Sequence, residues 1–116
     1  MANRPGDATL SEIFFSLIKN AIEAASHKPQ STQVTISTGR GENSVTVPVS
    51  DNGPGIPVEL RDQLFDPFVT DKIEGTGLGL FLVAERVRNI EGTIHCNSDS
   101  ARGTEFRVQI PTGPER

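Results

Sequence analysis

The stretch LSEIFFSLIKNAIEAAS, residues 10–26, carries the clearest structural signal in the chain. Its apolar side chains recur at intervals of three and four residues, which places them on one face of an α-helix. The residues of this face are Leu10, Ile13, Phe14, Leu17, Ile18, Ala21 and Ala25. Thr9 and Glu12 have the spacing of a capping box. We therefore expect a helix over about 10–26 whose apolar face packs against the rest of the domain.

The segments that follow alternate between strand and helix patterns. Alternating apolar and polar residues predict strands over 33–38 and 44–50, joined as a hairpin. Pro48 cannot donate a ladder hydrogen bond, so it predicts an edge position or a bulge in the second strand. Pro57 suits the first position of a short helix over about 57–64.

A second long helix is predicted over about 78–91, with Gly92 as its stop, and two strands over 93–97 and 104–110. This order of elements is typical of an α+β fold in which helices pack on one face of a sheet. We expect one domain over residues 9–111, with residues 1–8 and 112–116 frayed at its ends.

Composition excludes several classes of function. The 116 residues carry a formal charge of −4, which gives no general attraction for nucleic acid. The longest apolar run is far short of the roughly 18 to 20 residues of a membrane helix, and the first twenty residues lack a signal-peptide pattern, so we expect a cytoplasmic domain without membrane contact. Cys96, His27 and His95 provide neither a disulfide nor a zinc ligand set.

Polar residues on one flank of the first predicted helix are candidates for metal binding. Asn20 borders the apolar face, with Ser16 and Glu23 on the same flank. An asparagine at such a border is a buried amide, an exposed polar residue, or a side-chain carbonyl offered to a hard cation such as Mg²⁺. The helix pattern alone leaves all three open.

The sequence DNGPG, residues 51–55, follows a predicted strand and reads first as a tight turn. Its two glycines, Gly53 and Gly55, also let backbone approach a flat ligand closely. The Asp51 carboxylate accepts hydrogen bonds and cannot donate them. It would suit the exocyclic amine of adenine and disfavour the carbonyl of guanine by about 1–3 kcal/mol.

The glycine-rich loop before the second long helix is a candidate phosphate cradle. Its residues are Gly75, Thr76, Gly77, Leu78 and Gly79. Backbone N–H groups at a helix N-terminus attract anions, and the nearby Lys72 could reach a phosphate. A glycine-rich hinge without a ligand and a solvated lysine are the other interpretations, because the spacing matches neither common phosphate-binding fingerprint.

Five motifs in fixed order along residues 16–106 resemble the catalytic ATP-binding domain of sensor histidine kinases. They are LIKNA at 17–21, DNGPG at 51–55, FDPF at 65–68, GTGLGL at 75–80 and GTEF at 103–106. The short stretch between Lys72 and Gly75 resembles the short-lid subgroup, which includes nitrogen-regulation and oxygen-sensing kinases. The resemblance implies a two-layer α/β sandwich, with a mixed sheet covered on one face by helices.

The resemblance also implies roles for individual residues. Asn20 would coordinate Mg²⁺, Asp51 would recognise adenine, and Gly53 and Gly55 would shape the base pocket. Thr104 would approach the adenine from the opposite strand. The residues that would flank the phosphates in a mobile lid are Lys72, Gly75, Thr76, Gly77, Leu78 and Gly79. Phe65 and Phe68 would anchor that lid or serve as ordinary core aromatics.

Two features depart from the family pattern. Ser16 occupies the position where the family usually has a second asparagine and related ATPases have a glutamate, and a hydroxyl is a poor general base. The chain also lacks the strands that commonly precede the first helix. A missing strand would leave one sheet edge bare.

The resemblance implies transfer of the γ-phosphoryl group of Mg-ATP to a histidine of an upstream dimerisation domain, with a response regulator as the next recipient. Neither His27 nor His95 lies in a sequence resembling the family's acceptor box. The alternatives are an anti-sigma-type serine kinase and a nucleotide-binding scaffold with weak catalysis, the latter suggested by Ser16.

Overall fold

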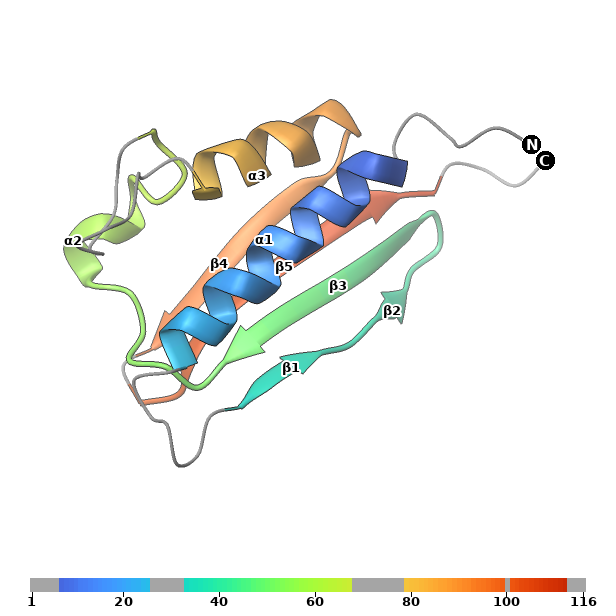
Figure 1. Cartoon of the computed structure of the whole chain (residues 1–116). Coiled ribbons are helices and arrows are strands. Elements are labelled where there is room, and N and C mark those ends of the chain that lie inside the picture. The colour runs from blue at the N-terminus through green and yellow to red at the C-terminus, as the bar shows by residue number, and fades with distance from the viewer. Residues whose placement is uncertain (1–6, 26–32, 68–78, 100, 113–116) are drawn as a thin grey trace.

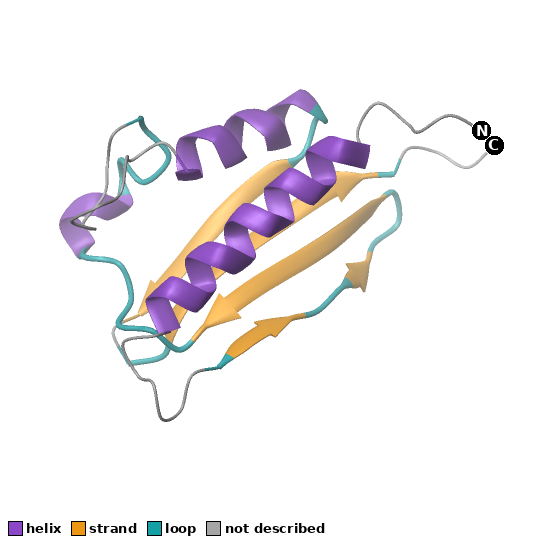
Figure 2. Ribbon diagram, in the orientation of Figure 1, coloured by secondary structure: helices purple, strands orange, loops and turns teal. Residues whose placement is uncertain are grey.

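The computed structural model describes residues 7–25, 33–67, 79–99 and 101–112. Two long helices lie on one face of a sheet, giving two layers, and a short helix lies near the ends of the strands (Figures 1 and 2). The elements in chain order are α1 (Asp7–Ala25), β1 (Val34–Ile36), β2 (Gly39–Arg40), β3 (Ser44–Asp51), α2 (Val58–Arg61), α3 (Gly79–Asn89), β4 (Thr93–Asp99) and β5 (Gly103–Pro111). No helix in these ranges is long and apolar enough to cross a membrane.

The sheet has the strand order β1-β3-β5-β4, and β2 also pairs with β3. Every pairing among the described strands is antiparallel, so the expected α+β class and helix-covered sheet are confirmed, but the expected mixed pairing is wrong here. The physical reason is the position of β5. It lies between β3 and β4, which run in the same direction, and it separates the two strands that would otherwise pair in parallel.

The core lies between the sheet and the two longer helices. Alternate residues of β3 and β5 point toward the helices, as the two-residue period of a strand requires. The buried cluster consists of Ile13, Leu17, Ala21, Val49, Leu64, Val83, Val87, Phe106 and Val108. Phe65 packs against it in an edge-to-face arrangement with Phe106, at 6.2 Å between ring centroids. Of the two phenylalanines expected to anchor the lid, Phe65 is therefore a core aromatic, and Phe68 lies outside the described residues.

The N-terminal end of α1 differs from the prediction. The helix begins at Asp7, so two residues expected to fray are helical and Thr9 lies inside the helix. A capping box is thus wrong for Thr9 and Glu12. The Glu12 carboxylate instead accepts a hydrogen bond at 2.8 Å from Nε of Arg86 and joins α1 to α3.

Pro48 lies in a central strand without a bulge, contrary to the expectation of an edge or a bulge. The register of β3 with β5 is unbroken past Pro48, which pairs with Arg107. Its missing N–H faces the other neighbour, since its carbonyl oxygen accepts from the N–H of Ser37 at 3.3 Å. Residues 37 and 38 interrupt the edge between β1 and β2. The missing donor therefore costs one ladder bond at a place where the edge strand is already broken.

The two later helices are shorter than predicted. In α2, Pro57 is the residue before the helix rather than its first helical residue. In α3, Glu91 takes the left-handed conformation with φ 63°, and Gly92 follows it. The N–H of Gly92 donates to the Val87 carbonyl at 2.9 Å, and that of Glu91 to Arg88 at 2.9 Å. This is a Schellman ending. Gly92 has a separate constraint, because a Cβ there would lie 2.7 Å from the Gln109 carbonyl oxygen.

Candidate functional site

Three polar residues lie side by side across the ends of three strands. Asp51 ends β3 and pairs with Thr104 of β5, which in turn pairs with Ser98 of β4. Register partners point to the same face of a sheet, so these three side chains form one line, which we call the polar row. Val49 and Phe106 occupy the next position on this face and belong to the core. The polar row therefore faces the helix layer.

Asp51 is a buried carboxylate held by backbone donors. Asp51 is only 5% exposed, and its Oδ1 accepts a hydrogen bond from the N–H of Gly53 at 2.7 Å. Burial raises the pKa of the Asp51 carboxyl from its ordinary value of 3.8, while backbone hydrogen bonds from Gly53 and Thr104 oppose that rise. The result is a fixed acceptor group at the end of β3.

The turn after Asp51 packs closely between α1 and β4. A Cβ on Gly53 would lie 2.6 Å from the carbonyl oxygen of Ala24 in the last turn of α1. Gly55 has φ 85°, and a Cβ there would lie 2.9 Å from the carbonyl oxygen of Asp99 at the end of β4. Both glycines singled out from the sequence are thus required by close backbone approach. Their packing holds the turn in place, and this role does not depend on a bound ligand.

Gly103 allows β5 to begin directly beside Asp51. It has φ 105°, and a Cβ at this position would lie 2.0 Å from the Asp51 carbonyl oxygen. Only glycine fits both the conformation and the space. This close approach brings Thr104, the next residue, alongside Asp51.

A pair of hydroxyl groups connects the polar row to the turn. Ser98 Oγ accepts from the N–H of Ile56 at 2.7 Å and lies 3.0 Å from Oγ1 of Thr104. Sequence analysis did not select Ser98, because the predicted strand ended at residue 97. The available signal was the hairpin itself, since pairing residues symmetrically about the 99–103 turn places Ser98 opposite Thr104.

The metal-binding candidate lies on the adjacent flank of α1. Figure 1 shows the C-terminal ends of α1 and β3 at the same end of the molecule. Asn20 is half-buried and precedes Ala24 by four residues, one turn along the same side of the helix. Ser16 is half-buried one turn earlier still. Because Ala24 packs against Gly53, this flank of α1 leads into the turn that follows Asp51.

The expected phosphate segment falls mostly outside the described residues. Those lying outside are Lys72, Gly75, Thr76, Gly77 and Leu78. Gly79 is the first residue of α3 and is exposed, and a Cβ there would meet no atom within 4 Å. The structure therefore brings together Asp51, Gly53, Gly55 and Thr104, with Asn20 on the neighbouring helix.

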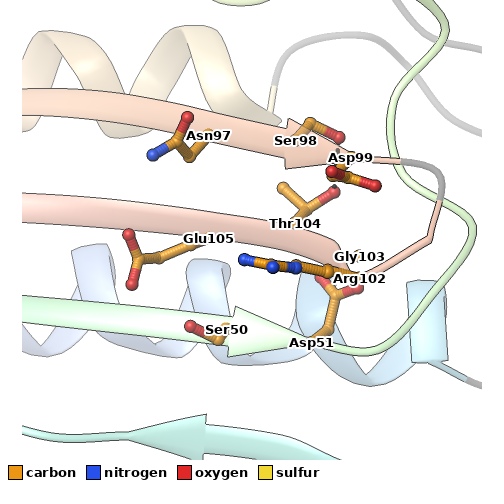
Figure 3. Close-up of a pocket in the computed structure, with 9 residues that line it drawn as sticks. All are labelled: Ser50, Asp51, Asn97, Ser98, Asp99, Arg102, Gly103, Thr104 and Glu105. Carbon is orange, nitrogen blue, oxygen red and sulfur yellow. Dashed lines mark hydrogen bonds between the residues drawn. The ribbon is translucent and has the colours of Figure 1, made fainter.

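A hollow of about 360 Å³ opens at the same end of the sheet (Figure 3). It is lined by Ser50, Asp51, Asn97, Ser98, Asp99, Arg102, Gly103, Thr104 and Glu105. Ser50, Asn97 and Glu105 alternate with the polar row and so belong to the face without helices. Figure 3 shows the helices behind the strands and the Arg102 side chain extended over the sheet in front. The hollow is thus lined at the strand ends by residues of both faces, with the polar row on the side of the helices.

Cys96 occupies the position next to Ser98 on the helix-facing side of β4, opposite Phe106. Burial raises the pKa of its thiol to about 11, while Arg61 lowers it and Asp51 raises it further. A protonated thiol is a weak nucleophile and a poor metal ligand. Among the described residues there is also no group of three or more His, Cys, Asp or Glu side chains that could hold a metal ion. A divalent cation at this site would need oxygen atoms from a ligand.

Comparison with known proteins identifies the family. The model of histidine kinase-, DNA gyrase B- and HSP90-like ATPases matches residues 6–114, and the chain belongs to this family. The sensory histidine kinase/phosphatase NtrB of Rhizobium leguminosarum bv. phaseoli is 37% identical over 119 residues, covering 91% of this chain. The chain spans 31% of the length of that relative.

Solved structures agree in fold. The catalytic domain of histidine kinase ThkA superposes with a TM-score of 0.80 at 30% identity, covering 92% of this chain and 69% of that one. Full-length ShkA, in complex with AMPPNP, superposes with a TM-score of 0.76 at 25% identity, covering 89% of this chain and 21% of that one. The predicted resemblance to sensor histidine kinase ATP-binding domains is confirmed.

Proposed function

We propose that this chain binds Mg-ATP and, within a longer cytoplasmic sensor kinase, transfers the γ-phosphoryl group to a histidine of a separate dimerisation domain. The observation that carries the proposal is the buried Asp51 carboxylate beside Thr104, at the end of a sheet whose family is that of ATPases. The AMPPNP bound to the related ShkA, an ATP analogue, supports the same ligand class.

The polar row suits the purine base. The Asp51 carboxylate is oriented by two backbone hydrogen bonds and can accept from the exocyclic amine of adenine. Guanine and hypoxanthine place a carbonyl oxygen at the same ring position, which would face a second acceptor. Gly53 and Gly55 keep the turn close to the sheet end, so that its backbone can approach a flat ring.

Asn20 is proposed as the protein oxygen for Mg²⁺. Its carbonyl lies on the flank of α1 that leads to the turn, and Mg²⁺ typically takes one or two protein oxygens with phosphate oxygens and water completing its shell. The segment from Lys72 to Gly79 is proposed to hold the phosphates. Bound Mg-ATP would supply the transferred phosphoryl group.

This chain's contribution to the chemistry would be positioning rather than proton abstraction. Ser16 stands where related ATPases have a carboxylate, and its hydroxyl is a poor base. Phosphoryl transfer depends mainly on alignment and neutralisation of charge, so a histidine acceptor with its own nucleophilic nitrogen lessens the need for a base. His95 is exposed and shares the helix-free face with Asn97, away from the polar row. Neither His27 nor His95 lies in a sequence resembling an acceptor box, so the acceptor is proposed to lie in another domain.

Titration calorimetry with Mg-ATP tests the binding site. Asp51→Asn should weaken binding at least tenfold, about 1.4 kcal/mol, because the amide can turn a donor toward the adenine amine. Glu42→Gln is the matched control, since it makes an acid-to-amide change at an exposed residue that precedes β3, at the opposite end of that strand from Asp51. Equal affinities of the parent and Asp51→Asn would refute the adenine assignment.

Asn20→Ala tests the metal site in the same assay. The variant should lose the magnesium dependence of its nucleotide affinity while its helical circular dichroism is unchanged. Identical magnesium titrations for the variant and the parent would remove Asn20 from the site.

Phosphotransfer requires the acceptor to be supplied. With a dimerisation domain from the same full-length protein and labelled ATP, the product should be acid-labile, as phosphohistidine is. An acid-stable product would indicate serine phosphorylation instead. Binding of Mg-ATP without any transfer would favour the scaffold function that Ser16 suggests, and would overturn the kinase assignment.

A further inference from the structure

Ser98 has two hydrogen-bond neighbours in the described structure, the backbone N–H of Ile56 and the hydroxyl of Thr104. The N–H of Ile56 can only donate, so Ser98 Oγ is the acceptor of that bond at 2.7 Å. The remaining neighbour is Oγ1 of Thr104 at 3.0 Å. The distance allows either hydroxyl to donate, but of the two neighbours only Thr104 Oγ1 can accept the single proton of Ser98.

The direction of the Ser98 hydrogen bond decides where the Thr104 hydroxyl can donate. In the arrangement in which Ser98 donates to Thr104 Oγ1, the hydroxyl proton of Thr104 points away from Ser98, and Thr104 is buried. Thr104 is the register partner of Asp51, so its hydroxyl stands beside a carboxylate that can only accept. The end of the sheet therefore presents an acceptor and a donor next to each other.

We infer that Ser98 is a positioning residue for nucleobase selection: by donating to Thr104 it makes the Thr104 hydroxyl a donor toward the base. This rests on the proposed function. Adenine presents an amine donor next to the ring nitrogen acceptor N1, the complement of an acceptor beside a donor. Hypoxanthine presents a carbonyl oxygen next to an N–H at N1, which conflicts with both groups.

A purely structural role of the Ser98 hydroxyl and a positioning role predict different effects on nucleotide binding. Loss of the hydrogen bond from Ile56 would loosen the turn and weaken the binding of all nucleotides by the same factor. Loss of the proton direction would instead allow Thr104 to rotate and accept from the N–H of hypoxanthine. The quantity to measure is therefore a ratio, the dissociation constant for Mg-ITP divided by that for Mg-ATP.

The experiment measures this ratio by calorimetry for the parent chain, Ser98→Ala, Ser98→Thr and Thr104→Val. We expect Ser98→Ala to lower the ratio at least fivefold, and Ser98→Thr, which keeps a hydroxyl, to stay within twofold of the parent. Thr104→Val should lower the ratio as well. Thr93→Val is the matched control, because it removes a hydroxyl from an exposed position of the same strand, and it should leave the ratio unchanged.

A double variant tests whether Ser98 acts through Thr104. If it does, Ser98→Ala with Thr104→Val should have the ratio of Thr104→Val alone. A further fall in the double variant, or an unchanged ratio in Ser98→Ala, would overturn the inference. Should Ser98→Ala lose its folded circular dichroism spectrum, Ser98→Cys makes the same comparison, because a thiol is a weak donor and acceptor.

The outcomes for the inference and for the proposed function are distinct. If the parent chain binds neither Mg-ATP nor Mg-ITP, the nucleotide-binding function itself fails. If the parent prefers Mg-ATP and Ser98→Ala keeps the full preference, the function stands and the role of Ser98 is refuted.

Discussion

Gly53→Ala tests the packing that holds the turn after Asp51 in place. The added Cβ would lie 2.6 Å from the carbonyl oxygen of Ala24, 2.8 Å from its carbonyl carbon and 2.9 Å from Oδ1 of Asp51. Two of these atoms are backbone of the last turn of α1 and cannot rotate away. Either the turn or the end of α1 must move by several tenths of an ångström.

The cost follows from the size of that displacement. Insertion of a methyl group into a well-packed place typically lowers the free energy of unfolding by about 1–3 kcal/mol. A domain of 116 residues gains entropy of roughly 0.24 kcal/mol/K at its unfolding midpoint. We therefore expect Gly53→Ala to melt about 4 to 12 °C below the parent chain.

Thermal unfolding followed by circular dichroism measures the effect. Gly39→Ala is the control, because Gly39 is an exposed strand glycine whose added Cβ would meet only the Thr46 carbonyl oxygen, at 4.0 Å. It should remain within about 2 °C of the parent, the range of neutral surface substitutions. If Gly53→Ala melts as the control does, the turn does not pack against α1 as described.

Three further predictions concern charge and reactivity. Asp51→Asn should melt at a higher temperature than the nucleotide-free parent at neutral pH. The pKa of the Asp51 carboxyl is raised in the folded state, so the folded chain binds this proton more tightly than the unfolded chain does. The resulting stability is present at low pH and is lost as the pH rises above 3.8, and an uncharged amide avoids that loss. The difference should shrink in melts near pH 3.8, and a parent that is the more stable chain at neutral pH would contradict it. Cys96, with a pKa of about 11 against an ordinary 9.0, should be alkylated at pH 8 roughly a hundredfold more slowly in the folded chain than in guanidinium, as followed by mass spectrometry; equal rates would refute its burial. Glu12→Gln should lower the free energy of unfolding by less than about 1 kcal/mol in denaturant melts, with no effect at high salt, because the pair with Arg86 is partly exposed; a larger, salt-independent loss would show that the contact is more than a surface ion pair.

The sequence predicted the elements well where their patterns are periodic. The apolar face of α1 and the alternation in β3 are local consequences of side chains that must be buried, so both elements are recovered within a few residues. Ends of elements were less predictable. The helix begins at Asp7, so Thr9 and Glu12 lie inside it, and Glu12 pairs with Arg86, 74 residues away, a contact that no local pattern reports.

The candidate site was partly predictable for a similar reason. Asp51, Gly53 and Gly55 stand in one short motif and were selected together. Ser98 lies on another strand, and its significance depends on the register that places it opposite Thr104 and beside Ile56. The hairpin turn at 99–103 suggests this register, but the apolar pattern ended the predicted strand at residue 97 and so left Ser98 out.

The sequence by itself determined the class of the fold, the family and the choice of Asp51 as the candidate acid, because those follow from periodicity and from motifs of fixed spacing. Tertiary structure alone decided how the parts meet. It placed Pro48 in a central strand with its missing donor toward a break in the edge, and it aligned Asp51, Thr104 and Ser98 in one row. The physical reason is that contacts between distant strands depend on mutual packing, which no segment contains on its own.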